Sequence, residues 1–278
     1  MVETSARLLT RVAASRYCTL LRTYCARPLS RRPPGSASSP VMARVRRRRV
    51  LLVSLGATAL VMSTALGAAA SAPATTSSVL KAVKTAISKQ TGVHEVESWS
   101  PGPASWFWIT DLGTKSGEET LSAGKTRDTY RLTPTYLYVA GNSSGLMTIG
   151  LTAAQAKKVG KDWISVKAGT TLYAAIKFGL TISSHAVFLP PAKGTTLSTT
   201  VTDGVHLYVL KWTTAATKFG PKCSSTMTIS AVGVTLPVEL ITTFPSGSTT
   251  TRFSRWGEHV AVSPPPVAST ISYSKVTS

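Results

Sequence analysis

Between Val93 and Val139 the sequence breaks into short apolar runs about ten residues apart, and this spacing constrains the fold more than any other feature. The runs are rich in β-branched and aromatic residues, and they are separated by turn residues such as Pro101-Gly102, Gly113 and Thr133-Pro134. Connections this short join neighbouring antiparallel strands. The segment therefore predicts an antiparallel meander of five strands with the sequences VHEVESWS, ASWFWITDLG, GEETLSA, RDTYRLT and TYLYVA.

Side-chain alternation does not tell which face of this meander points inward. Trp106-Phe107-Trp108-Ile109 and Tyr136-Leu137-Tyr138-Val139 alternate well, but both of their faces carry large apolar groups. The inward face of these strands therefore stays open.

Helices are predicted at two places around the meander. The segment SSVLKAVKTAISKQTG precedes it, ends at Gly92 and carries one apolar face. Leu151 to Lys161 and Thr171 to Leu180 follow it, have helical spacing and flank the short strand DWISV. The apolar face of the first helix consists of Val79, Leu80, Val83, Ala86 and Ile87.

Strands then resume as GVHLYVLKW, STMTISAVG, TLPVELITTF and TTTRFSRWG, and a polar tail ends the chain. The order of helix, strands, helices and strands predicts an α+β fold with one long antiparallel sheet and its helices gathered on one side. It lacks the regular βαβ alternation of nucleotide-binding folds.

A basic run, RVRRRR at Arg44 to Arg49, stands before 21 uncharged residues from Val50 to Ala70. This arrangement is typical of a signal peptide, with cleavage after Ala70 or Ala74, although the same length can also remain as an uncleaved signal anchor. The predicted organisation is a disordered upstream extension at 1–41, the signal at 42–74 and one domain at 75–278. We therefore expect an extracytoplasmic location, either secreted or anchored to the outer face of the cytoplasmic membrane.

The net charge of +20 is concentrated at the start of the chain, where twelve of the 31 basic residues lie up to Arg49. A nucleic-acid-binding face needs its basic residues clustered on folded structure, so we expect no nucleic-acid partner. Cys223 is the only cysteine of the exported part. It excludes an internal disulfide or a Cys-based zinc site there, and a buried, inert thiol is expected.

Motifs for catalysis or metal binding are weak, and we expect no catalytic residue, metal or cofactor. GNSSG fits the nucleophile elbow of serine hydrolases, with Ser143 or Ser144 as nucleophile, but a surface turn explains it better. A hydrolase stays as a remote alternative. Its conceivable partners are Asp162, Asp203, His185, His206 and His259.

The close carboxylate pair Glu95 and Glu97 is predicted to mark a solvated side of the sheet, because residues two apart on a strand share a face. The group Lys157, Lys158 and Lys161 is interpreted as a solvated helix face, with contact to anionic head groups or cell-wall polymers as the alternative.

Four segments in order carry a family resemblance: TYLYVAGN, GKDWISV, MTISAVGVTLPVEL and RFSRWGEHVAVSPPP. The chain resembles the actinobacterial lipoprotein carriers of the LppX and LprG type, which are related in fold to LolA and LolB. The resemblance implies a curved antiparallel half-barrel sheet whose concave face is covered by helices, with a hydrophobic cavity for acyl chains. The lipobox cysteine of such lipoproteins is absent, since Leu66-Gly67-Ala68 is followed by Ala69.

The resemblance implies an exported, non-enzymatic carrier of the cell envelope or membrane that binds a lipid or acylated ligand as a monomer. The alternative is a cell-surface sensor or interaction module of the same fold with a filled core. Trp163 and Trp256 are expected to be buried anchors with paired indole N–H groups. The cavity residues predicted for a carrier are Val83, Ile87, Phe107, Ile109, Leu137, Val139, Ile176, Leu180, Leu207 and Val209.

Overall fold

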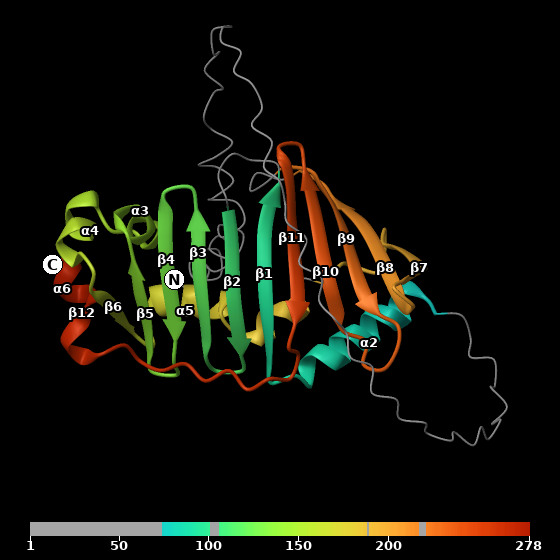
Figure 1. The fold of residues 1–278 in the computed structure, drawn as a ribbon, viewed down its shortest axis with the longest axis horizontal. Helices are drawn as coiled ribbons and strands as arrows, with labels where there is room; N and C mark the ends of the chain where they lie inside the picture. Colours follow the sequence, from blue (N-terminus) through green and yellow to red (C-terminus); the bar gives the residue numbers. More distant parts are fainter. Residues whose placement is uncertain (1–73, 101–105, 188, 217–220) are drawn as a thin grey trace, which may run out of the picture. The chain divides into compact units, whose positions relative to one another are not determined.

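The described part of the chain forms one large open sheet with helices packed on it (Figure 1). The computed structural model describes residues 74–100, 106–187, 189–216 and 221–278. The sheet has twelve strands in the order β12-β6-β5-β4-β3-β2-β1-β11-β10-β9-β8-β7. All neighbours are antiparallel except β12 and β6, which are parallel. The predicted α+β class with one long, mostly antiparallel sheet is confirmed, and β12 and β6 form a parallel pair at its edge.

The meander and the late strands lie where the runs predicted them. The first half contains β1 (Gly92–Ser100), β2 (Trp106–Gly113), β3 (Gly117–Ala123), β4 (Thr126–Leu132), β5 (Tyr136–Gly141) and β6 (Trp163–Lys167). The second half contains β7 (Thr196–Thr202), β8 (Val205–Thr214), β9 (Cys223–Ser230), β10 (Pro237–Phe244), β11 (Gly247–Ser254) and β12 (Thr270–Ser272). Pairing of β1 with β11 joins the two halves into one sheet.

The first predicted helix is α2 (Thr76–Ser88). It ends four residues earlier than the predicted end at Gly92, because Gly92 is already the first residue of β1. Thr75 and Ser78 form a capping box at its start. Its apolar face packs on the core as expected, with Leu80 only partly buried. The buried members are Val79, Val83, Ala86 and Ile87.

The middle of the chain supplies several further short helices. These are α3 (Ser143–Leu146), η1 (Met147–Ile149), α4 (Ala153–Val159), α5 (Thr171–Gly179) and η2 (Ile182–Val187). Thr152 and Thr170 cap α4 and α5 with their hydroxyl groups. In Figure 1, α5 runs behind the strands. We call the face of the sheet toward α5 its inner face, and residues of both α5 and η2 lie against it.

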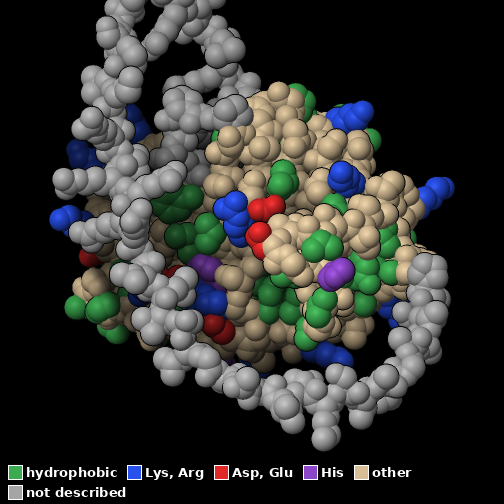
Figure 2. Space-filling view, turned by 45° about the vertical axis from the view of Figure 1, so that its right-hand side comes forward, with side chains coloured by type: hydrophobic (Ala, Val, Ile, Leu, Met, Phe, Trp, Pro, Cys, Tyr) green, Lys and Arg blue, Asp and Glu red, His purple; other side chains and the backbone are tan. Residues whose placement is uncertain are grey.

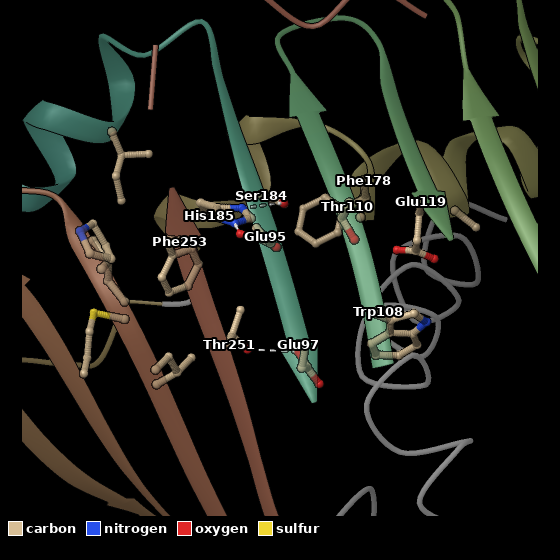
Figure 3. Close-up of a pocket in the computed structure, with 17 residues that line it drawn as sticks. Glu95, Glu97, Trp108, Thr110, Glu119, Phe178, Ser184, His185, Thr251 and Phe253 are labelled. Carbon is tan, nitrogen blue, oxygen red and sulfur yellow. Dashed lines mark hydrogen bonds and ion pairs between the residues drawn. The ribbon is translucent and has the colours of Figure 1, made fainter. Parts of the chain in front are cut away.

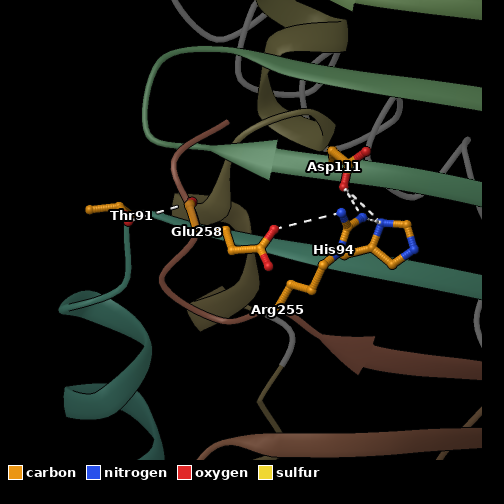
Figure 4. Close-up of polar contacts among 5 residues, drawn as sticks. All are labelled: Thr91, His94, Asp111, Arg255 and Glu258. Atoms are coloured by element: carbon orange, nitrogen blue, oxygen red, sulfur yellow. Dashed lines mark hydrogen bonds and ion pairs between the residues drawn. The ribbon is translucent and has the colours of Figure 1, made fainter. Parts of the chain in front are cut away.

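The chain after β11 follows one end of the strands toward the far edge of the sheet, where η3 (Val267–Ser269), β12 and α6 (Tyr273–Thr277) complete the fold (Figure 1). A polar cluster fixes its beginning (Figure 4). Arg255 donates to Asp111 at 2.9 Å and lies 3.6 Å from Glu258, while His94 Nδ1 is 2.7 Å from the same Asp111 oxygen. Thr91 donates to the backbone of this segment. The tail is therefore part of the sheet, which its polar composition did not predict.

The predicted extension at 1–41 and the predicted signal at 42–74 lie outside the described residues, apart from Ala74. Within the described part, no helix combines the length and the apolar character that crossing a bilayer requires.

Candidate functional site

A pocket opens on the inner face of the sheet beneath α5 and η2 (Figure 3). Strands β1, β2, β3, β9, β10 and β11 form its floor, and α2, α5 and η2 form its walls. The cavity itself has a volume of about 110 Å³, whereas about 1000 Å³ of empty space lies in the pocket when the open solvent at its mouth is included. Most of this space is therefore narrow or continuous with the solvent.

Two rows of side chains cross the floor of the pocket, because residues that stand opposite each other on neighbouring strands share a face. One row, running from β11 to β3, consists of Phe253, Glu95, Thr110 and Glu119. The other row, running from β10 to β2, consists of Leu240, Thr251, Glu97 and Trp108. Strand pairing thus brings three carboxyl groups together among apolar and aromatic groups.

Glu97 is the most deeply buried of these carboxyl groups, with 6% of its surface exposed. Thr251 donates a hydrogen bond of 3.0 Å to Glu97 Oε2, and Glu97 Oε1 has no hydrogen-bond partner among the described residues. Burial is the main cause that raises the pKa of Glu97 to about 8. The Thr251 hydrogen bond lowers this pKa, and the nearby charges of Glu95 and Glu119 add to the rise. Glu97 is therefore mostly protonated at pH 7.

The Glu95 carboxyl group contacts the His185 ring of η2 through Nε2, so this contact links the floor of the pocket to its cover (Figure 3). His185 also meets Phe253 edge-on, with 6.1 Å between ring centroids, and Phe253 stacks on Trp256 at 6.0 Å. The Trp256 indole donates to the Pro237 carbonyl at 2.9 Å, as expected for an anchor, although Trp256 is only half-buried. These contacts form an aromatic wall on the β10–β11 side.

In space, Ser184 lies next to His185 and His185 lies next to Glu95, as in a Ser-His-acid catalytic triad, but the hydrogen bonds do not fit one. Ser184 Oγ lies 3.4 Å from His185 Nδ1 and donates instead to the Thr181 carbonyl at 2.8 Å. Ser184 is also only 1% exposed. A nucleophilic serine must present its oxygen to the substrate and give its proton to the histidine. The Ser184 hydroxyl therefore serves to hold the η2 turn.

The residues of the predicted nucleophile elbow lie elsewhere. Ser143 and Ser144 are exposed at the start of α3, where Asn142 Oδ1 accepts a hydrogen bond from the Gly145 amide at 2.9 Å. This is an ordinary helix cap. Among the conceivable partners, His185 is engaged by Glu95 in the pocket.

The predicted cavity residues occupy three settings. Ile87 lines the pocket. Another group lies in the buried core and comprises Val83, Leu137, Val139, Ile176 and Leu180. The third group lies on β2 and β8, where the neighbouring residues Trp108 and Thr110 line the pocket and Tyr208 and Trp212 pack on the core. Because side chains alternate along a strand, the predicted residues on β2 and β8 point to the outer face, away from the pocket and the core. They are Phe107, Ile109, Leu207 and Val209.

The interpretation of Glu95 and Glu97 as a solvated pair is wrong. The two residues do share a face, but this face carries the pocket. Glu97 is buried there, and Glu95 is half-buried against His185 of η2. Sequence reasoning also missed Glu119, Thr251 and Phe253 as pocket residues. Their only signal is the register between strands, which a single strand does not contain.

Other sequence expectations concern residues away from the pocket. Lys157, Lys158 and Lys161 are exposed on and just after α4, as expected for a solvated face. Cys223 is half-buried at the start of β9, which corrects the expectation of a buried thiol. Trp163 is also half-buried, with the Arg131 guanidinium 4.9 Å from its ring centroid. Within the described ranges, no three Cys, His, Asp or Glu residues form a metal-binding group.

No protein-family model matches the chain, and no curated protein matches it. Among solved structures, the chain is similar to LprF from Mycobacterium bovis, with 14% identity, 68% of this chain and 96% of that chain covered, and a TM-score of 0.42. It is also similar to the Mycobacterium tuberculosis lipoprotein LppX, with 16% identity, 68% and 98% covered, and a TM-score of 0.43. A conserved Thermus thermophilus protein gives 8% identity, 70% and 98% coverage, and a TM-score of 0.38.

Proposed function

We propose that this chain is an exported, non-enzymatic carrier of lipid or acylated molecules in the cell envelope, of the LppX and LprG type. The observation that supports it most is the open pocket between the sheet and its helical cover. The apolar side chains of Phe178, Leu189, Met227 and Leu240 line it beside the carboxyl groups. The basic and apolar segments between Arg44 and Ala70 support export.

Burial of an acyl chain supplies enough free energy for such a carrier without any catalytic group. Each methylene removed from water contributes about 0.8 kcal/mol, so a chain of about sixteen carbons gives on the order of 10 kcal/mol before the cost of ordering. Sites that enclose a small molecule usually have about 300 Å³ or more. Because the cavity volume here is only about 110 Å³, uptake of a long chain requires α5 and η2 to move away from the sheet.

A cell-surface sensor or interaction module with a filled core is the second candidate, and the narrow interior favours it. Native mass spectrometry of the protein purified from its own envelope separates the two. A carrier brings a lipid of defined mass with it. A module is ligand-free, and after delipidation it binds neither an extract of envelope lipids nor the neutral apolar dye N-phenyl-1-naphthylamine, a result that would overturn the carrier proposal.

A further inference from the structure

Glu97 is a buried polar residue of the pocket for which a purely apolar ligand would offer no hydrogen-bond partner. Its side chain is 6% exposed, and one of its two oxygens, Oε1, meets no hydrogen-bond partner in the described part of the chain. A buried polar atom without a hydrogen-bond partner is destabilising, and native structures seldom retain one without a role. A ligand that brings a donor to Glu97 Oε1 removes this penalty.

The charge around Glu97 is negative, although the chain as a whole is strongly basic. Glu119 lies in the neighbouring row and is 8% exposed, and Glu95 lies two residues away on β1. His185, which pairs with Glu95, is the one basic group among the described residues that line the pocket, where no Lys or Arg is present. A ligand with an anionic head group would therefore meet carboxyl groups without a lysine or arginine to bind it.

We propose that the pocket selects amphiphiles whose head group is a protonated primary amine, an inference that rests on the proposed function. The ammonium donates a hydrogen bond to Glu97 Oε1, and the apolar chain lies against Phe178, Leu189 and Leu240. An ammonium has three donors and no acceptor, so it complements a site of carboxyl oxygens. Its hydrogen bond to a carboxylate is about twice as strong as a bond between neutral groups. Below pH 8 the proton of Glu97 leaves to the solvent when the ammonium binds.

The test compares three probes that share a twelve-carbon chain and differ only in the head group. Dodecylamine, dodecanol and dodecanoate displace N-phenyl-1-naphthylamine from the full-length protein at pH 7, below their micelle concentrations. We expect dodecylamine to bind about tenfold more tightly than dodecanol, and dodecanoate to bind most weakly. Equal binding of the three probes, or preference for dodecanoate, overturns the inference and leaves the carrier function standing. Failure to bind the dye and all three probes overturns both.

Matched variants locate the selectivity. Glu97→Gln keeps the shape of the side chain and an acceptor for Thr251, so it should fold normally and lose the tenfold preference for the amine over dodecanol. Glu118→Gln is the control, because Glu118 precedes Glu119 on β3 but points the other way and pairs with Arg131 at 3.2 Å. It should keep the preference. Equal preferences in the two variants would contradict the assignment to Glu97.

A pH series tests the same contact without any substitution. Because Glu97 must lose a proton to pair with the ammonium, the affinity for dodecylamine should rise up to about tenfold per unit between pH 6 and pH 8 and then level off, while that for dodecanol stays flat. The other titratable groups that line the pocket are Glu95, Glu119 and His185. The rise should disappear in Glu97→Gln. A rise that persists there, or none in the parent protein, overturns the inference.

Discussion

Glu97 couples the stability of the fold to pH. Its pKa is raised from 4.5 to about 8 in the folded state, so between these values the folded protein holds a proton that the unfolded chain has lost. The free energy of unfolding should therefore fall as pH rises from about 4.5 to 8 and level off above. The full shift corresponds to about 5 kcal/mol as an upper limit. We expect Glu97→Gln to gain stability over the parent protein at pH 8 but not at pH 5, measured by urea unfolding.

The matched substitution for this prediction is again Glu118→Gln. Glu118 is half-buried beside Arg131 on the outer face, so its loss should leave the pH dependence of the parent protein unchanged. If Glu97→Gln and the parent protein lose stability equally between pH 5 and pH 8, the carboxyl group of Glu97 is not the cause.

At the scale of single residues, the sequence predicts the geometry of the site better than its environment. The two-residue spacing of Glu95 and Glu97 correctly predicts a shared face. The spacing does not reveal that Thr251 of β11 stands opposite Glu97, or that His185 of η2 contacts Glu95, because both partners lie far away in the sequence. Carboxyl groups are rarely buried, so the prediction of a solvated pair followed the common case and missed the pocket.

At the scale of elements, the strands with strong alternation were predictable and the edge strands were not. The runs of the meander predict β1 to β5 within a few residues. By contrast, β7 has the sequence TLSTTVT, in which Leu197 and Val201 are the only large apolar residues, and it is mostly exposed at the sheet edge. Similarly, β12 has three residues and pairs with β6 across more than one hundred positions. Such elements depend on their neighbours rather than on their own sequence.

The cap of α5 should control how firmly this helix covers the pocket. The Thr170 hydroxyl accepts a hydrogen bond from the Tyr173 amide at 3.3 Å. Thr170→Ala removes this bond and should lower the free energy of unfolding by about 1 kcal/mol, measured by urea denaturation. Thr170→Ser keeps a capping oxygen and should stay within about 0.5 kcal/mol of the parent protein. Equal losses in both variants would show that the cap does not account for the effect.

Gly92 allows the segment after β11 to lie close to β1. A Cβ atom at this position would clash with the Glu258 carbonyl oxygen and would lie only 2.9 Å from Val260 Cγ2. Gly92→Ala should therefore displace the segment and cost about 1 to 3 kcal/mol in urea unfolding. Ser98→Ala on the same strand is the control, because Ser98 is exposed and its loss should cost less than about 0.5 kcal/mol. Equal stability of the two variants would contradict the close contact.

At the scale of the whole molecule, the basic residues and the acidic pocket residues are separated. Lys and Arg side chains stand singly over the face seen in Figure 2, among polar and hydrophobic groups. The carboxyl groups of Glu95, Glu97 and Glu119 instead lie together on the inner face of the sheet. The strongly positive net charge therefore does not describe the pocket, whose charged lining is mainly carboxyl groups.

A carrier and a filled-core module differ in how the whole domain responds to ligand. A ligand that binds only the folded state at one hundred times its dissociation constant adds about 2.7 kcal/mol, which for a domain of this size raises Tm by roughly 5 to 11 °C. We expect dodecylamine to produce such a rise in differential scanning calorimetry. Hexylamine carries the same head group but six fewer methylenes, worth about 5 kcal/mol of burial, so at the same concentration it should leave Tm unchanged. A Tm that dodecylamine does not raise would contradict the amine preference. A Tm that dodecylamine, dodecanol and dodecanoate all leave unchanged is the behaviour expected of a module whose interior its own side chains fill.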